Sequence, residues 1–294
     1  MKMKKLWAFV DERKNIADEW YYFLVLLIPD EQATLVKSWL HSAREDFHSP
    51  IKFAKLNSNG RGRKVEIAKT WMQEVLRSAR DDRNDLYFSL TGLNLNRLDP
   101  KAFGGANCAH GQTLANIHNR FFRKSLSNAI TDFWGGAPIL IRKVFHDSEG
   151  NLQNHQYFDW HAISKTMSDH SHITFESDNI TFVLSDHRKE KHHENASHII
   201  QLVDVLLGAI TYCFHPSHSR NKGQEEVAME TVELVKRLSH APRNPNSAYN
   251  YYKKFKVGFF PKKNSYAGED DLFYHRREIE LLNMKSGQQI FELC

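Results

Sequence analysis

Short apolar runs and helically spaced apolar positions alternate along the chain. Runs at residues 5–10 and 20–28, joined by a polar segment, predict an antiparallel hairpin. Apolar positions then recur at helical spacing between residues 33 and 43, which predicts a helix that ends before Pro50. The chain is therefore expected to begin with a hairpin followed by a helix.

The same kind of pattern continues along the rest of the chain. Further strands are predicted at residues 51–56, 86–93, 139–145, 173–176 and 180–184. Further helices are predicted at residues 65–76, 113–134, 155–167, 195–214 and 225–238. Residues 94–111 are expected to form a long irregular loop. This mixture of strands and helices indicates an α/β protein.

The predicted helix at 195–214 is apolar around most of its circumference, which is typical of a buried helix. One face nevertheless carries residues spaced by threes and fours, namely His198, Gln201, Asp204, Gly208 and Thr211. A buried, ionised carboxylate is costly without a partner, and metal coordination is one arrangement that keeps it charged. Gly208 is expected to let another part of the backbone approach closely.

Two more carboxylates follow predicted strands. Asp11 comes after the first strand, and Asp186 comes after the strand at 180–184. Ligand sites in α/β sheets form beyond the carboxyl ends of the strands, so Asp11 and Asp186 can meet there if their strands are parallel neighbours. A helix packed across that edge could add Asp204. The alternative is that each aspartate only forms a turn or caps a helix.

Three segments of the chain form a recognisable set: Val10-Asp11-Glu12, Ser185-Asp186, and Gln201-Leu202-Val203-Asp204 followed by Gly208-Ala209. Together they resemble a widespread prokaryotic family of unassigned function that is predicted to be RNase H-like, the domain-of-unknown-function 3800 family. The match covers roughly residues 1–56 and 139–214. The chain departs from the family at three places, where Arg13 and His187 replace serine and Val203 replaces alanine.

The resemblance implies phosphodiester chemistry at a site that holds Mg²⁺ or Mn²⁺. Hard cations prefer oxygen ligands, and two of them about 4 Å apart can activate water and stabilise the leaving oxygen. The implied metal ligands are Asp11, Asp186 and Asp204. Glu12 and Asp147 are candidates for a remaining acidic position, and Asp147 is favoured if its strand lies beside the first strand. Gln201 is expected to support the ligands without binding the metal itself.

The charge balance weakly favours a polyanionic partner. Lysine and arginine exceed aspartate and glutamate by 40 to 35, which gives a net charge of +5. The basic residues expected to contact phosphates are Arg61, Arg63, Lys64, Lys253, Lys254 and Lys256. The last three are interleaved with aromatic residues that can stack on unpaired bases. The alternative for this tail is an amphipathic strand with a charged outer face.

Other residues exclude some classes of site. Three scattered cysteines, Cys108, Cys213 and Cys294, are too few for a disulfide framework or a thiolate zinc site. There are 17 histidines, but their spacing does not form a zinc site, since His193 and His198 do not share a helix face. No apolar run approaches the roughly 20 residues of a membrane span. We expect a cytoplasmic protein that does not contact a membrane.

The sequence thus predicts an RNase H-like mixed sheet flanked by helices, with extra helical and C-terminal elements. Residues 1–215 would form the core with its insertions, and residues 216–294 a helical and basic-aromatic extension. The predicted function is a metal-dependent nuclease or phosphodiesterase, a hydrolase acting on DNA or RNA. The alternative is a non-catalytic nucleic-acid-binding or assembly module, and either fits a role in an antiphage or toxin system. A homo-oligomer or a partner protein stays open.

Overall fold

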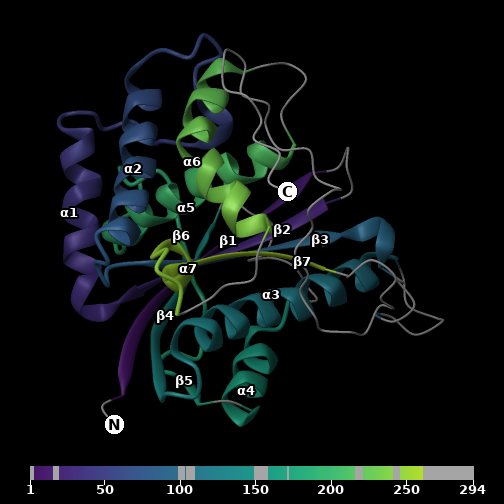
Figure 1. Cartoon of the computed structure of the whole chain (residues 1–294). Coiled ribbons are helices and arrows are strands. Elements are labelled where there is room, and N and C mark those ends of the chain that lie inside the picture. The colour runs from purple at the N-terminus through teal and green to yellow at the C-terminus, as the bar shows by residue number, and fades with distance from the viewer. Residues whose placement is uncertain are drawn as a thin grey trace.

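A computed structural model describes residues 3–15, 20–98, 103, 110–148, 158–170, 172–215, 221–240 and 246–260. One mixed sheet runs through the molecule and is flanked by helices on both faces (Figure 1). The α/β class and the mixed sheet flanked by helices are therefore confirmed.

The sheet has the order β5-β4-β1-β2-β3-β7, with β6 also paired to β4. Strands β1, β2 and β3 form an antiparallel meander. Strand β4 runs parallel to β1, and β7 runs parallel to β3. Both β5 and β6 run parallel to β4. The strands are β1 (Lys4–Asn15), β2 (Trp20–Pro29), β3 (Tyr87–Asn94), β4 (Ile139–Asp147), β5 (Ile173–Phe175), β6 (Thr181–Val183) and β7 (Phe255–Phe260).

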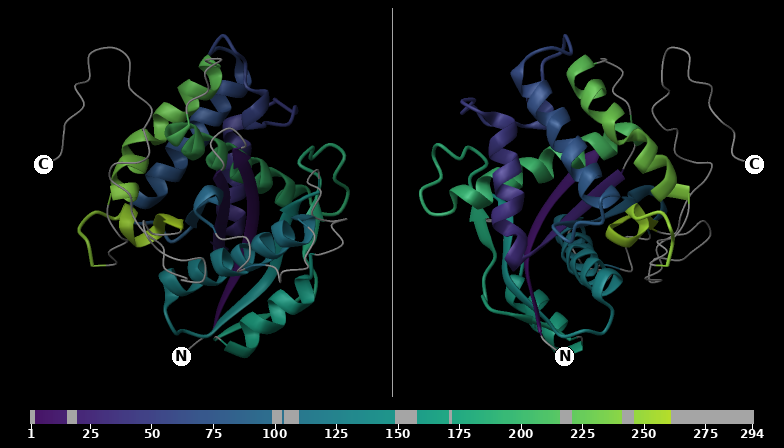
Figure 2. Two further views of the ribbon diagram at one scale, coloured as in Figure 1. Left: turned by 90° about the vertical axis from the view of Figure 1, so that its right-hand side faces the viewer. Right: turned by 60° about the vertical axis from the view of Figure 1, so that its left-hand side comes forward.

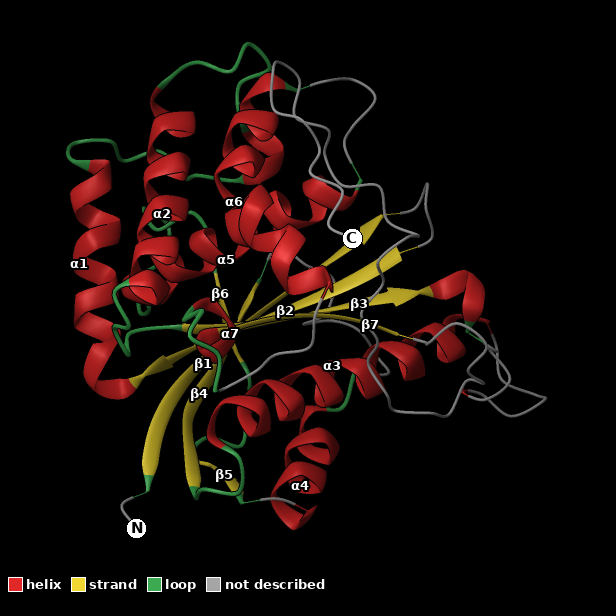
Figure 3. Ribbon diagram, viewed as in Figure 1, coloured by secondary structure: helices red, strands yellow, loops and turns green. Residues whose placement is uncertain are grey.

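The helices lie in two layers (Figure 2). One core joins α1, α2, α5 and α6 to one face of the sheet, and a second core joins α3 and α4 to the other face. Figure 3 shows these layers above and below the strands. The helices are α1 (Ala33–Arg44), α2 (Arg63–Arg80), α3 (His110–Trp134), α4 (Trp160–His170), α5 (Glu194–Phe214), α6 (Lys222–His240) and the short α7 (Tyr251–Lys254).

Helix α5 is the centre of the first layer. Nearly all of its residues are buried, as its all-round apolar character predicts. In the described part of the chain it is the one helix long and apolar enough to cross a membrane, yet 94% of its apolar window is buried inside the protein. Such burial is typical of the core helix of a globular protein.

The predicted strand at 51–56 is wrong, because this segment contains a 3₁₀ helix at Phe53–Lys55. Its backbone has no neighbouring strand. The amide of Ile51 instead donates to Gln201 Oε1 at 2.8 Å, and the amide of Phe53 donates to Asp204 Oδ2 at 2.7 Å. Side chains of α5 therefore satisfy the donors that a sheet would otherwise have used.

The long loop expected at 94–111 is shorter than predicted at both ends. A 3₁₀ helix forms at Leu95–Arg97, and α3 already begins at His110. Except for Phe103, residues 99–109 lie outside the described residues.

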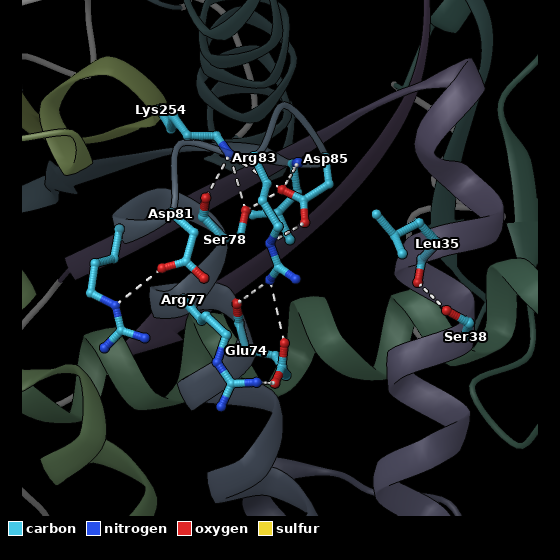
Figure 4. Close-up of polar contacts among 11 residues, drawn as sticks. Leu35, Ser38, Glu74, Arg77, Ser78, Asp81, Arg83, Asp85 and Lys254 are labelled. Carbon is cyan, nitrogen blue, oxygen red and sulfur yellow. Dashed lines mark hydrogen bonds and ion pairs between the residues drawn. The ribbon is translucent and has the colours of Figure 1, made fainter.

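The C-terminal extension contributes to the same sheet as the first 215 residues. Helix α6 packs on α5 and α2, and β7 pairs with β3. At the end of α7, the buried Lys254 donates to Ser78 Oγ of α2 at 3.0 Å and lies 3.2 Å from Asp85 Oδ1 (Figure 4). A buried ion pair therefore ties the extension to Asp85, which lies between α2 and β3.

Candidate metal centre

Asp11 of β1 faces Asp204 of α5, and the two carboxylates form the centre of the candidate site. Burial raises the pKa of Asp11 well above its ordinary value, and repulsion from Asp204 raises it further. Burial also raises the pKa of Asp204, although the hydrogen bond from the Phe53 amide opposes this shift. Both side chains keep some solvent-exposed surface. Two mutually repelling carboxylates at a partly open position are suited to a bound cation.

Asp11 lies inside a strand, and not after its end as the sequence predicts. Strand β1 continues to Asn15, and Asp11 pairs with Leu24 of β2. Because side chains alternate along a strand, Asp11 points to the same face as Phe9 and Arg13, and Val10 points to the other face. This alternation directs the Asp11 carboxylate toward α5.

Asp147 is the third acid near this pair. Strand β4 lies beside β1 in parallel, which is the condition under which the sequence favours Asp147 over Glu12. The charge of Asp147 raises the pKa of both Asp11 and Asp204. Its Oδ2 atom lies 3.4 Å from the amine of Lys52. Asp147 therefore belongs to the centre and is partly neutralised by a lysine.

The structure does not bring the Asp186 carboxylate together with Asp11 and Asp204, so the expected meeting of these three acids is not observed. Strand β4 lies between β1 and β6, so Asp11 and Asp186 do not follow neighbouring strands. The Asp186 carboxylate instead accepts two hydrogen bonds of 2.9 Å from Arg188. These bonds lower the pKa of Asp186 to about 2.

Glu12 does not lie at the Asp11–Asp204 centre either, because strand alternation directs its side chain to the opposite side of β1 from Asp11. Its Oε2 atom lies 2.6 Å from Nε2 of the buried His146. Burial opposes both charges, but the pair lowers the pKa of Glu12 and raises that of His146 to about 9. This ion pair stabilises the core between the sheet and α3.

Two cations that sequence reasoning missed lie near the carboxylates. The Arg13 guanidinium lies 5.5 Å above the Phe53 ring and attracts Asp204 and Asp11. Lys52 attracts Asp204 in addition to its ion pair with Asp147. Arg13 gave a signal in the sequence, since it replaces the serine of the resembling family. Lys52 gave none, because only the fold brings residue 52 to α5.

Gln201 and Gly208 fix the segment that carries Lys52. Gln201 accepts hydrogen bonds from Arg44 and the Ile51 amide, and donates to the Ser185 carbonyl at 2.6 Å. Gln201 therefore ties the 51–53 segment to α5, and its predicted support of the metal ligands stays a prediction. The Phe53 ring occupies the space where a Cβ atom of residue 208 would lie. Gly208 thus admits a side chain, and not the backbone that the sequence suggests.

The carboxylate oxygens of this site suit a hard cation that has few protein ligands better than a cation coordinated by protein on all sides. Among the described residues, no group of three or more histidine, cysteine, aspartate or glutamate side chains has its ligand atoms close enough to hold a metal. Mg²⁺ commonly binds to only one or two carboxylates and keeps several waters or substrate phosphates as ligands. The carboxylates of Asp11 and Asp204 fit that requirement.

The predicted phosphate-binding residues have different environments. Arg61 is exposed, Lys64 is half-buried, and Arg63 forms ion pairs with Glu45 and Glu66. Lys253 is partly exposed and lies 3.9 Å from Asp82.

Two lysines of the tail are excluded as nucleic-acid contacts. Lys254 is buried against Asp85 (Figure 4), and Lys256 lies 2.5 Å from Asp132 and is mostly buried. An acidic partner inside the protein already neutralises each charge. The remaining tail, residues 261–294, lies outside the described residues.

A scan against models of known protein families finds no match, and a search of curated proteins finds no similar sequence. What the centre can do chemically therefore follows from its own donor atoms and charges. These are three carboxylates and two cations on one side of β1.

Proposed function

We propose that the chain is a divalent-metal-dependent phosphodiesterase that acts on nucleic acid, with Asp11 and Asp204 holding the cation. The observation that carries this proposal is the pair itself. Asp11 and Asp204 are 193 residues apart in the sequence, yet burial and mutual repulsion raise the pKa of Asp11. Natural proteins keep such unfavourable charge pairs chiefly at functional sites. The resemblance of both segments to an RNase H-like family supports the same chemistry.

The surrounding residues have complementary roles in this proposal. A bound Mg²⁺ or Mn²⁺ supplies an activated water and stabilises charge on the phosphate. Lys52 and Arg13 lie beside the carboxylates and carry the positive charge that attracts a phosphodiester. The Phe53 amide donates a hydrogen bond to Asp204, and the Phe53 ring lies under the Arg13 guanidinium. One short segment therefore positions both a ligand and a cation.

A second candidate function follows from the same two cations. Arg13 and Lys52 offset part of the negative charge of Asp11, Asp147 and Asp204 without any metal. A non-catalytic nucleic-acid-binding module could keep this arrangement for stability alone. The two functions differ in one measurable property, which is whether the centre binds a divalent cation.

Cleavage assays with end-labelled single- and double-stranded DNA and RNA in Mn²⁺ test the proposal. We expect the wild-type protein to cleave at least one of these substrates. Asp11→Asn and Asp204→Asn should each lower the rate by more than about 100-fold, because losing even an outer partner of a metal ligand costs 10–100-fold. Circular dichroism checks that both variants fold.

Asp186→Asn is the matched control, because it removes a carboxylate that lies outside the centre. It should retain the wild-type rate. Wild-type cleavage that survives in Asp11→Asn and Asp204→Asn would contradict the proposal. Binding of nucleic acid without cleavage, together with no heat of Mn²⁺ binding at millimolar concentration, would favour the non-catalytic module.

A further inference from the structure

A cavity of about 510 Å³ opens between α1, β1, β4 and the first turn of α5. Three aromatic rings line its inner wall as a stacked row. The Trp7 and Phe145 rings are 5.5 Å apart and inclined by 11°, and the Phe145 and Phe9 rings are 4.9 Å apart and inclined by 15°. Trp7 is the partly exposed ring of this row, so it is the ring that the cavity offers to a flat ligand.

The rings of this wall are held in place before any ligand binds. Trp7 donates its indole hydrogen to Asp30 Oδ1 at 2.5 Å, so the polar edge of the ring is already satisfied. Phe9 and Phe145 are almost fully buried. The ring of His193 meets the Phe145 ring edge-on at 5.9 Å. A ligand at this wall would thus lose little affinity to side-chain ordering.

The rim of the cavity is positively charged. Lys37 of α1 and Lys191 of the loop before α5 both line it. Within the part of the chain that the structure describes, neither amine has a carboxylate within 4 Å. Nearby Glu190 is bound by the amides of Leu184, His192 and His193, and Glu194 is the acid among the lining residues. The two amines are therefore available to an anion.

The cavity and the candidate metal centre share one face of β1. Trp7 and Phe9 line the cavity, and Asp11 is the next residue on that face. Four residue steps along the strand separate Trp7 from Asp11 and span about 13 Å. A nucleotide whose base stacks on Trp7 can therefore place the phosphate of the neighbouring nucleotide toward Asp11.

We propose that this cavity binds the base of one unpaired nucleotide of a single strand, next to the phosphate that reaches the Asp11–Asp204 centre. Trp7 stacks on the base, and Lys37 and Lys191 contact the backbone phosphates. The inference rests on the proposed function, because the strand is the substrate of that centre. It adds that the substrate is single-stranded at this position.

Anisotropy of a labelled ten-nucleotide single strand, measured without divalent metal, tests binding separately from cleavage. Trp7→Ala should weaken binding about tenfold, as expected for one lost base-stacking contact. Lys37→Gln with Lys191→Gln should lower the slope of log affinity against log salt by about 1.4, since each single-strand phosphate contact contributes about 0.7. Thr34→Trp, which fills the mouth of the cavity from an exposed position, should also weaken binding.

Lys165→Gln is the matched control, because it removes an exposed lysine of α4 on the other side of the sheet. It should leave both the affinity and the salt slope unchanged. A strand carrying 5-iodouracil should crosslink to Trp7 on irradiation, as mapped by mass spectrometry. Crosslinks confined to other regions would contradict the proposal.

The outcomes separate this inference from the proposed function. Metal-dependent cleavage with normal binding in Trp7→Ala, Thr34→Trp and the double lysine variant would overturn the cavity assignment and leave the function standing. Binding that depends on the cavity, without cleavage, would overturn the proposed function and leave the cavity assignment standing. A free mononucleotide that binds as tightly as the strand would overturn the assignment to a strand.

Discussion

Glu12 and His146 form a buried ion pair, with Glu12 Oε2 at 2.6 Å from His146 Nε2, on the opposite side of β1 from Asp11. Two consecutive acids of one strand therefore have unrelated roles. Asp11 faces a second carboxylate and is destabilising when ionised, and Glu12 faces a charged histidine and stabilises the fold. Substitution of the two acids should therefore change the free energy of unfolding in opposite directions.

Glu12→Gln should lower the free energy of unfolding by about 3 kcal/mol at pH 6, because it leaves His146 buried without its partner. The pKa of His146 is raised to about 9, so its contribution is complete below its unfolded pKa and is lost as the pH rises through 9. The difference between wild type and variant should therefore shrink as the pH rises from about 6.5 to 9 and be small above pH 9. Urea unfolding from pH 6 to 10 measures this, with the exposed Glu233→Gln as control. An unchanged difference across this range would refute the ion pair.

Asp11→Asn should raise the free energy of unfolding by about 1 kcal/mol at pH 7 in EDTA. The pKa of Asp11 is raised in the folded state, so ionisation at neutral pH opposes folding, and asparagine removes that charge. Added Mn²⁺ should raise the melting temperature of wild type but not that of the variant. Thermal unfolding measures both effects, and Asp169→Asn on the surface of α4 is the control. A less stable Asp11→Asn in EDTA would contradict carboxylate repulsion.

Gly208→Ala should cost about 2 kcal/mol, because the new Cβ atom meets the Phe53 ring. Moving Phe53 also disturbs its amide bond to Asp204, so cleavage should fall more than stability alone explains. Gly136→Ala is the matched control, since a Cβ atom there meets nothing closer than 3.6 Å. Equal stability of the two alanine variants would show that Phe53 does not fill this space.

Lys254→Met should lower the free energy of unfolding by about 3 kcal/mol and leave nucleic-acid affinity unchanged. The substitution removes the buried cationic partner of Asp85, which then has the more distant Arg83 at 3.4 Å and its hydrogen bonds from Ser78 and the Leu86 amide. The partly exposed Lys253→Met should have the opposite profile, with normal stability and weaker binding. Chemical unfolding and anisotropy measure the two properties. Weaker nucleic-acid binding by a folded Lys254→Met protein would show that Lys254 does contact a phosphate.

His198→Phe should make the protein less sensitive to acid. The His198 ring is 2% exposed and lies 4.2 Å from the ring of His41 and 4.3 Å from that of His187, with Arg44 and Lys37 also near. Burial and these neighbours lower the pKa of His198 to about 2.

Below about pH 6.5 the unfolded chain therefore binds a proton that the folded protein excludes, so the free energy of unfolding decreases as the pH is lowered from 7 to 5. We expect the variant to lose about 1 kcal/mol less than wild type between pH 7 and 5. Unfolding at several pH values measures this, with the exposed His161→Phe as control. Identical pH profiles would contradict the buried neutral imidazole.

Periodic apolar positions along the chain predict most of the helices and strands. The hairpin at Lys4–Pro29 and the buried helix at Glu194–Phe214 were predictable, because apolar periodicity depends only on neighbouring residues. Asp204 was predictable as well, since a carboxylate on an all-round apolar helix needs a partner. The strand at 51–56 was not, because side chains of α5 decide how its amides are bonded.

Strand pairing and helix packing, and no local pattern, bring particular acids together. Asp11, Asp147 and Asp186 look alike in the sequence, each near the end of a strand. The strand order β6-β4-β1 places Asp186 away from Asp11 and places Asp147 beside it. The alternation of side chains along β1 directs Asp11 and Glu12 to opposite faces of the sheet. Lys52 and the wall of Trp7, Phe9 and Phe145 arise only when distant segments pack together. Local patterns fix which residues share a face, but the pairing of strands fixes which faces meet.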